Sequence, residues 1–164
     1  MGVATTSTMM VRVDLEAEYR AHVADLVHYA TVLVGPHDAM DVVNEAVTAT
    51  IARDSLVAVD DVRAYWFRAV SLTAAGWHRA EYRRRSREAR AASLEVSPGA
   101  TERGEDGRRL LAGLSMQQRS VIYMTYWLDW DPARIAAALD VSDGAVRKQL
   151  ARGREQLREV LRDA

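Results

Sequence analysis

The sequence predicts an all-α protein made of two small helical domains joined by a flexible linker. Apolar residues recur mostly every three or four positions, as in helices, and the alternating β-branched pattern typical of strands is absent. The chain has 164 residues, 49% of them apolar, which is enough to fill two small cores. Residues 91–107 contain few large apolar side chains and carry Pro98, Gly99, Gly104 and Gly107, which indicates a linker.

The first domain is expected over residues 14–90, after a disordered tail of residues 1–13. A first helix fits Leu15–Val34, and "GPHD" ends it and caps a second helix at Ala39–Arg53. Residues 54–61 are expected to form a loop that ends in an N-cap. A third helix fits the segment from Val62 to about Arg87, with a bend near Gly76. The apolar face of the first helix is expected to comprise Tyr19, Val23, Leu26, Val27 and Ala30.

The second domain is expected over residues 108–164 and contains a helix-turn-helix pattern. Ser115 and Gln118 have the spacing of a capping box, which marks a helix start. Further on, Asp131 and Pro132 can start a short helix that ends at Asp140 and Val141. Ser142 can cap a final helix. Its inward positions are Val146, Leu150 and Leu157, and two helices joined by so short a turn form a helix-turn-helix.

The outward face of that final helix is basic. In helix-turn-helix proteins the second helix lies in the DNA major groove, where arginine and lysine contact guanine edges and phosphates. The pattern therefore predicts DNA binding, the alternative being an ordinary helical hairpin with a charged, solvated face. The outward residues are Arg147, Lys148, Ala151, Arg152 and Arg154.

The net charge of −1 conceals an uneven distribution. From Asp14 to Asp61 there are ten acids and two arginines, or −8. The segments 79–90 and 147–162 each have six basic residues and two acids, or +4 each. Basic clusters attract phosphate backbones, whereas the acidic segment suits a basic protein surface, so we expect two kinds of partner. The alternative is that all three are solvated helix faces.

Several classes of protein are not expected. The chain has no cysteine, which excludes disulfides and thiolate metal sites. It has neither a run of about 18 apolar residues nor a signal-peptide pattern, so we expect a cytoplasmic protein. His22, His28, His37 and His78 form no metalloprotease motif, and no nucleophile elbow or phosphate loop is present. We therefore expect no enzyme activity and no cofactor.

The motifs of both halves resemble those of extracytoplasmic-function (ECF) sigma factors. The segment "LSMQQRSVIYMTYWLDWDPARIAAALDVSDGAVRKQLARGREQLREVL" is similar to region 4 of that family. "YRAHVADLVHYATVLVGPHDAMDVVNEAVTATI" and "VRAYWFRAVSLTAAGWHRAEYRRR" resemble region 2. The resemblance covers about nine-tenths of the chain, with the stronger match in region 4.

This resemblance implies that the protein binds core RNA polymerase and promoter DNA. Proteins of this family can also bind an anti-sigma factor, which is a further candidate partner. The positions matching polymerase contacts are Asp41, Asn44 and Glu45. Arg147, Lys148, Ala151 and Arg152 match readers of the minus-35 element, and Arg119 and Arg154 match phosphate contacts. The DNA-binding residues expected on the third helix are Tyr65, Trp66, Arg68, Arg79, Arg83 and Arg84.

The sequence departs from the family pattern in region 2, and other functions stay open. Leu72 stands where the family has asparagine, and the acid expected before the basic end of that helix is missing. For Trp66 and Phe67, the alternative to a DNA contact is packing in the core. The alternatives to a sigma factor are a stand-alone helix-turn-helix regulator, which would need to dimerise, and an inactive sigma-like interaction module.

Overall fold

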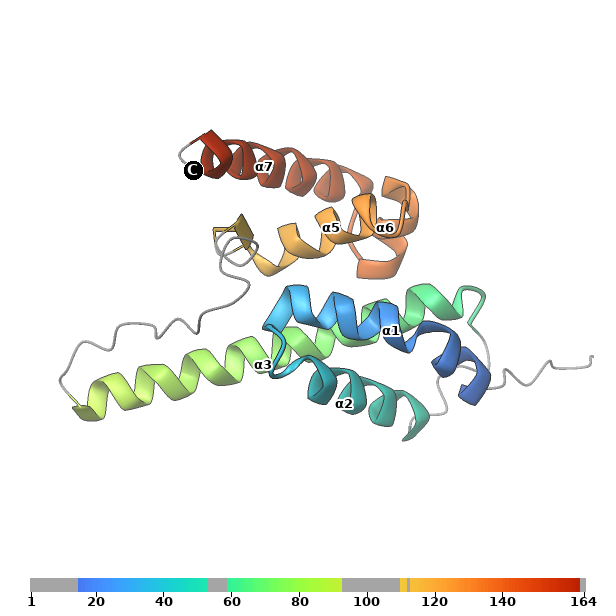
Figure 1. Ribbon diagram of the computed structural model, residues 1–164, viewed down its shortest axis with the longest axis horizontal. Helices are drawn as coiled ribbons and strands as arrows, with labels where there is room; N and C mark the ends of the chain where they lie inside the picture. The colour runs from blue at the N-terminus through green and yellow to red at the C-terminus, as the bar shows by residue number, and fades with distance from the viewer. Residues whose placement is uncertain (1–14, 53–58, 93–109, 112, 163–164) are drawn as a thin grey trace, which may run out of the picture.

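The computed structural model describes residues 15–52, 59–92, 110–111 and 113–162, and every regular element in these ranges is an α-helix (Figure 1). The predicted all-α class is therefore confirmed. The predicted tail and residues 93–107 of the predicted linker lie outside the described residues. Within the described ranges, no helix is both long and apolar enough to cross a membrane.

The first two helices form where the sequence predicts them. Helix α1 spans Leu15–Val34 and α2 spans Ala39–Ala52; Arg53 lies outside the described residues. Gly35 ends α1 with a left-handed φ of 93°, and its N–H donates to the Thr31 carbonyl oxygen at 2.9 Å. Glycine adopts this backbone region without strain, which explains the sharp exit from α1.

Helix α3 spans Val62–Ala92 and is longer than predicted. Asp61 caps it, because one carboxylate oxygen accepts from the Ala64 N–H at 2.9 Å. The helix runs unbroken through Gly76 and continues five residues beyond Arg87, where the sequence analysis ended it. In Figure 1 this C-terminal part of α3 reaches past the other helices.

Helices α5 (Met116–Tyr126), α6 (Pro132–Leu139) and α7 (Asp143–Arg162) build the second half. The predicted capping box is present, with Ser115 and Gln118 each bonding the other's backbone N–H. Asp131 caps α6, whose first residue is Pro132. The helix-turn-helix of α6 and α7 is therefore confirmed, with local signals that define each end.

The two halves share one hydrophobic core in this structure. Figure 1 shows α5 and α6 between α7 on one side and α1 and α3 on the other. The rings of Phe67 on α3 and Trp130 before α6 meet edge to face, with centroids 5.4 Å apart. The ring centroids of Tyr29 on α1 and Tyr123 on α5 lie 5.0 Å apart. The buried apolar residues of both halves thus form one continuous cluster.

Candidate nucleic-acid interface

The basic face of α7 is held outward by close packing on its inner side. Val146 and Leu150 are buried, while the five residues predicted to face outward are all exposed. Gly153 is also buried, and a Cβ atom there would lie 2.6 Å from the Ile122 Cδ1 atom of α5. The sequence analysis missed Gly153, although a glycine inside a helix is itself a signal of close approach.

The turn before α7 fixes the direction in which that helix leaves. Asp140 adopts the left-handed conformation, with φ 56° and ψ 49°, and Val141 donates to the Ala136 carbonyl oxygen at 3.1 Å. The Ser142 hydroxyl then accepts from the Ala145 N–H at 3.2 Å. These bonds satisfy backbone groups at both helix ends, so local contacts define the backbone of the turn.

Two arginines on this face have partners within the same half. The Arg154 Nε donates to the Tyr126 hydroxyl at 2.5 Å, and its guanidinium lies 5.4 Å from that ring's centroid. Arg147 has a weaker ion pair with Asp143, at 3.7 Å, and its side chain is 70% exposed. Arg154 is therefore held in place, whereas Arg147 can reorient toward a ligand.

Arg119 is partly buried between the two halves, in contrast to the exposed Arg154, the other predicted phosphate contact. Its Nε donates to the carbonyl oxygens of Leu111 and Leu114, at 3.0 and 3.2 Å. One terminal nitrogen donates to the Leu33 carbonyl oxygen at the end of α1, at 3.2 Å. Burial lowers the pKa of this guanidinium. In this arrangement Arg119 ties α5 to α1, and these bonds occupy two of its three guanidinium nitrogens.

The predicted DNA-binding residues at the start of α3 separate into two groups. Trp66 and Phe67 are fully buried, which favours the packing role for both. Tyr65 and Arg68 are half-buried, and Arg68 pairs with Asp140 across the two halves at 3.1 Å. Leu72 is 62% exposed. Trp66 cannot reach DNA from its present position.

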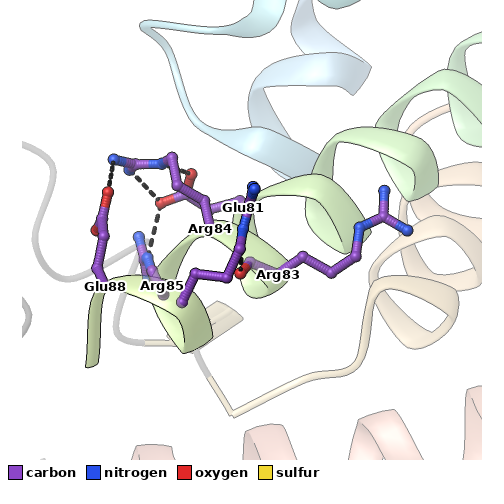
Figure 2. Close-up of polar contacts among 6 residues, drawn as sticks. Glu81, Arg83, Arg84, Arg85 and Glu88 are labelled. Atoms are coloured by element: carbon purple, nitrogen blue, oxygen red, sulfur yellow. Dashed lines mark hydrogen bonds and ion pairs between the residues drawn. The ribbon is translucent and has the colours of Figure 1, made fainter. Parts of the chain in front are cut away.

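The basic end of α3 contains a set of ion pairs, shown in Figure 2. One Glu81 oxygen accepts from Arg84 at 2.8 Å and from Arg85 at 2.7 Å, and Arg84 also pairs with Glu88 at 2.9 Å. These hydrogen bonds lower the pKa of Glu81 to about 2. Among the described residues, Arg79 and Arg83 have no carboxylate partner, and both are exposed.

The predicted polymerase contacts form an acidic patch on α2. Asp41, Asn44 and Glu45 are all exposed on the side of the helix away from the core. Glu45 also accepts a hydrogen bond from the Trp77 indole N–H of α3, at 2.7 Å. The structure therefore brings these three residues together and holds one of them in place. In the described residues no group of three or more histidine and carboxylate side chains could hold a metal ion.

The seam between the two halves contains a buried hydroxyl network that the sequence analysis missed. The Tyr29 hydroxyl donates to the Ser120 hydroxyl at 2.8 Å and lies 2.6 Å from the Ser71 hydroxyl. Burial raises the pKa of Tyr29 to about 12. At the rim, Arg134 pairs with Asp61 at 2.8 Å. No local pattern indicates such contacts, because Ser120 is 91 positions from Tyr29.

Comparisons with known proteins show similarity to sigma factors. Residues 108–157 match the protein family described as "Sigma-70, region 4". The chain is also 34% identical, over 134 residues, to the RNA polymerase sigma-E factor of Streptomyces coelicolor, and the match covers 77% of this chain and 73% of that relative.

Two solved structures are similar in fold. One is the sigma factor RpoE in a co-crystal structure with the anti-sigma factor NepR from Bartonella quintana, with a TM-score of 0.69, 21% identity, and coverage of 91% of this chain and 97% of that one. The other is CnrH in complex with the cytosolic domain of CnrY, with a TM-score of 0.64, 23% identity, and coverage of 91% and 88%. At these identities both support the fold alone.

Proposed function

Because this chain belongs to the ECF sigma factors, which act in transcription initiation, we propose that it binds core RNA polymerase and directs it to specific promoters. The observation that carries this proposal is the exposed basic face of α7 behind a well-defined helix-turn-helix. The acidic patch on α2 and the basic end of α3 supply two further surfaces of the kinds that this function needs.

The proposed minus-35 reader is the N-terminal half of α7. In helix-turn-helix proteins this part of the second helix contacts base edges. Arg147 and Lys148 are exposed there, and neither is tightly held. We assign base contacts to these two residues, and to Arg152 one turn further on. Arg154 is fixed by Tyr126, which suits a phosphate anchor.

The proposed polymerase contact is the acidic patch of Asp41, Asn44 and Glu45. Two carboxylates four residues apart lie on one side of a helix and can pair with a basic surface. Their exposure leaves them accessible, while the opposite side of α2, with Val42, Val43 and Ala46, packs in the core. Reversing both charges with Asp41→Lys and Glu45→Lys should abolish co-purification with core enzyme. The matched control is Glu155→Lys with Glu159→Lys, which changes the net charge equally at the exposed far end of α7.

Simultaneous contact with both promoter elements requires the two halves to separate. The elements named minus-35 and minus-10 are about 25 base pairs apart, or roughly 85 Å at 3.4 Å per pair. Helix α7 packs on α5, which packs on α1, so the axes of α7 and α1 are about 20 Å apart at 8–10 Å per helix pair. Polymerase binding is the step that we expect to select the open form.

An anti-sigma factor is a further proposed partner, and the cytoplasm is the proposed location. Both solved structures to which the fold is similar are complexes, one of them with a named anti-sigma factor. A partner of that kind would stabilise the closed arrangement of the two halves. It would therefore compete with polymerase for the same molecule.

Run-off transcription tests the proposed function directly. Core RNA polymerase from Streptomyces coelicolor, with this chain and a library of promoter fragments, should give transcripts from a defined subset. Arg147→Ala should reduce transcription in a way that depends on one base pair, because a bidentate arginine–guanine contact contributes roughly 1–3 kcal/mol of discrimination. Arg162→Ala, at the last turn of α7, is the control. Promoter-independent transcription, or an equal loss on every promoter, would contradict the assignment.

A further inference from the structure

Glu45 is held by a neighbouring helix, unlike the other two residues of the acidic patch on α2. Its Oε2 atom accepts a hydrogen bond from the indole N–H of Trp77 at 2.7 Å, although the two residues are 32 positions apart in the sequence. In the part of the chain that the structure describes, the side chains of Asp41 and Asn44 have no hydrogen bond or ion pair. The patch therefore combines one fixed carboxylate with two side chains that are free to rotate.

Trp77 can fix Glu45 because its own side chain is fixed by packing. The indole ring is half-buried and lies against the hydrophobic core. An indole N–H can only donate, and a hydrogen bond to an ionised carboxylate is stronger than one to a neutral acceptor. A donor anchored in the core of the first half thus determines where one oxygen of Glu45 lies.

The indole orients Glu45 without cancelling its charge. Two arginines hold Glu81, further along α3, and their positive charges neutralise that carboxylate. Trp77 is uncharged, so Glu45 keeps its negative charge for a basic partner. The second oxygen of Glu45, Oε1, has no hydrogen-bond partner among the described residues. Glu45 is therefore held at one oxygen and open to a partner at the other.

The hydrogen bond between Trp77 and Glu45 should matter more for binding than for folding. It lies at an exposed site, where water can replace either partner, so its net effect on stability is small. A glutamate side chain has several rotatable bonds, and ordering such a side chain at an interface costs free energy. Because Trp77 orders Glu45 before any partner arrives, that cost is not incurred when a partner binds.

We propose that Trp77 is a positioning residue for polymerase binding, which presents Glu45, already ordered and still charged, to a basic side chain of the core enzyme. This inference rests on the proposed function, because it takes the acidic patch on α2 as the polymerase contact. Trp77 acts through Glu45 and need not touch the enzyme itself. Asp41 lies on the same side of α2 without such a bond, so it supplies the comparison within the same patch.

The first test detects the hydrogen bond in the free, full-length chain by NMR. Each of the four tryptophans gives one indole N–H signal in protein labelled with a nitrogen isotope, and Trp77→Phe identifies the Trp77 signal by its loss. Glu45→Ala should shift that signal upfield and speed its exchange with water, because the acceptor is gone. Asp41→Ala should leave the signal where it is. A Trp77 signal that does not respond to Glu45→Ala would overturn the inference.

The second test measures the affinity of the fluorescein-labelled chain for core RNA polymerase from Streptomyces coelicolor by fluorescence anisotropy. Trp77→Phe removes the N–H and should weaken binding by about 2- to 12-fold, which is the effect expected from ordering one flexible side chain. Benzothienylalanine at position 77 keeps the bicyclic ring and also lacks the N–H. It should weaken binding to the same extent, which separates loss of the hydrogen bond from loss of packing. Native affinity with this isostere would contradict the role of the N–H.

Double-mutant cycles show whether Trp77 acts through Glu45. In a Glu45→Ala background, Trp77→Phe should have no further effect on polymerase affinity, whereas in an Asp41→Ala background its effect should be undiminished. Full additivity with Glu45→Ala, or equal coupling to both carboxylates, would overturn this inference and leave the proposed polymerase contact in place. A Glu45→Ala variant that binds core enzyme as tightly as the native chain would instead overturn the contact of Glu45 with polymerase, and the positioning role with it.

Discussion

Replacing Tyr29 by phenylalanine should destabilise the protein at neutral pH and leave its core packing intact. The hydroxyl is fully buried and contacts the Ser71 and Ser120 hydroxyls. Both serines retain bonds to their own helix carbonyls, at 2.9 and 3.0 Å, so neither is left without a partner. The loss is therefore about 1–3 kcal/mol, for two bonds of roughly 0.5–1.5 kcal/mol each.

The same substitution should change the response to alkali. The pKa of Tyr29 is raised from 10.0 to about 12, so its stabilising effect is complete below pH 10 and is lost as the pH rises through 12. Between these values the native protein should lose about 1.4 kcal/mol per pH unit from this group. The Tyr29→Phe variant has no group that titrates at this position, so it does not lose this stability. The difference in free energy of unfolding between the native chain and the variant should therefore be smaller near pH 12 than at pH 7, or reversed in sign.

Urea unfolding at pH 7 and at pH 11.5 measures both effects. Tyr82→Phe is the matched control, because it removes a hydroxyl from an exposed ring. It should leave the free energy of unfolding unchanged at both pH values. A double-mutant cycle of Tyr29→Phe with Ser120→Ala isolates the bond that joins the two halves. The reasoning is refuted if Tyr29→Phe is as stable as the native chain at pH 7, or if its deficit is the same at both pH values.

Substitutions at four further positions test packing, capping and the turn, each by urea denaturation. Gly153→Leu should lower the free energy of unfolding by about 1–3 kcal/mol, because the added side chain must displace the Ile122 Cδ1 methyl group, which would lie 2.6 Å from its Cβ atom; an unchanged midpoint would contradict that contact. Ser115→Ala should cost about 1 kcal/mol through loss of the α5 cap, and Ser142→Ala, at the α7 cap, should behave similarly. Asp140→Gly should be about 1 kcal/mol more stable than Asp140→Ala, since only glycine adopts the left-handed backbone freely, and equal stabilities would argue against a left-handed Asp140.

The sequence predicts the helix ends well where they depend on neighbouring residues. Caps at Ser115, Asp131 and Ser142 involve bonds within three residues, so their signals are local. The end of α3 was predicted wrongly because the last large apolar residue of the helix is Tyr82, so no apolar pattern marks where the helix stops. The helix continues because ion pairs one turn apart, such as Arg84 with Glu88, and good helix formers maintain it without burial.

The exposure of the candidate DNA-binding residues was predictable for α7 but not for every residue of α3 and α5. Charge and helical spacing identify the exposed side of α7 and the basic end of α3. The spacing of Glu81, Arg84 and Arg85 was an available sign that these arginines pair. Nothing local shows that Arg119 donates to a carbonyl oxygen 86 positions away, because the partner has no side-chain signature.

Buried aromatic side chains supply most of the stability of the contact between the two halves, and the ion pairs across this contact add little to it. Arg134 and Asp61 are each about two-fifths exposed, and Asp140 in the pair with Arg68 is 77% exposed, so each pair contributes about 0–1 kcal/mol. Tyr29, Phe67 and Trp130 are buried and contact rings from the other half. Opening would therefore expose apolar surface, at a cost that depends weakly on salt. A partner that opens the molecule must cover part of that surface, whereas one that holds it closed need only leave the seam undisturbed.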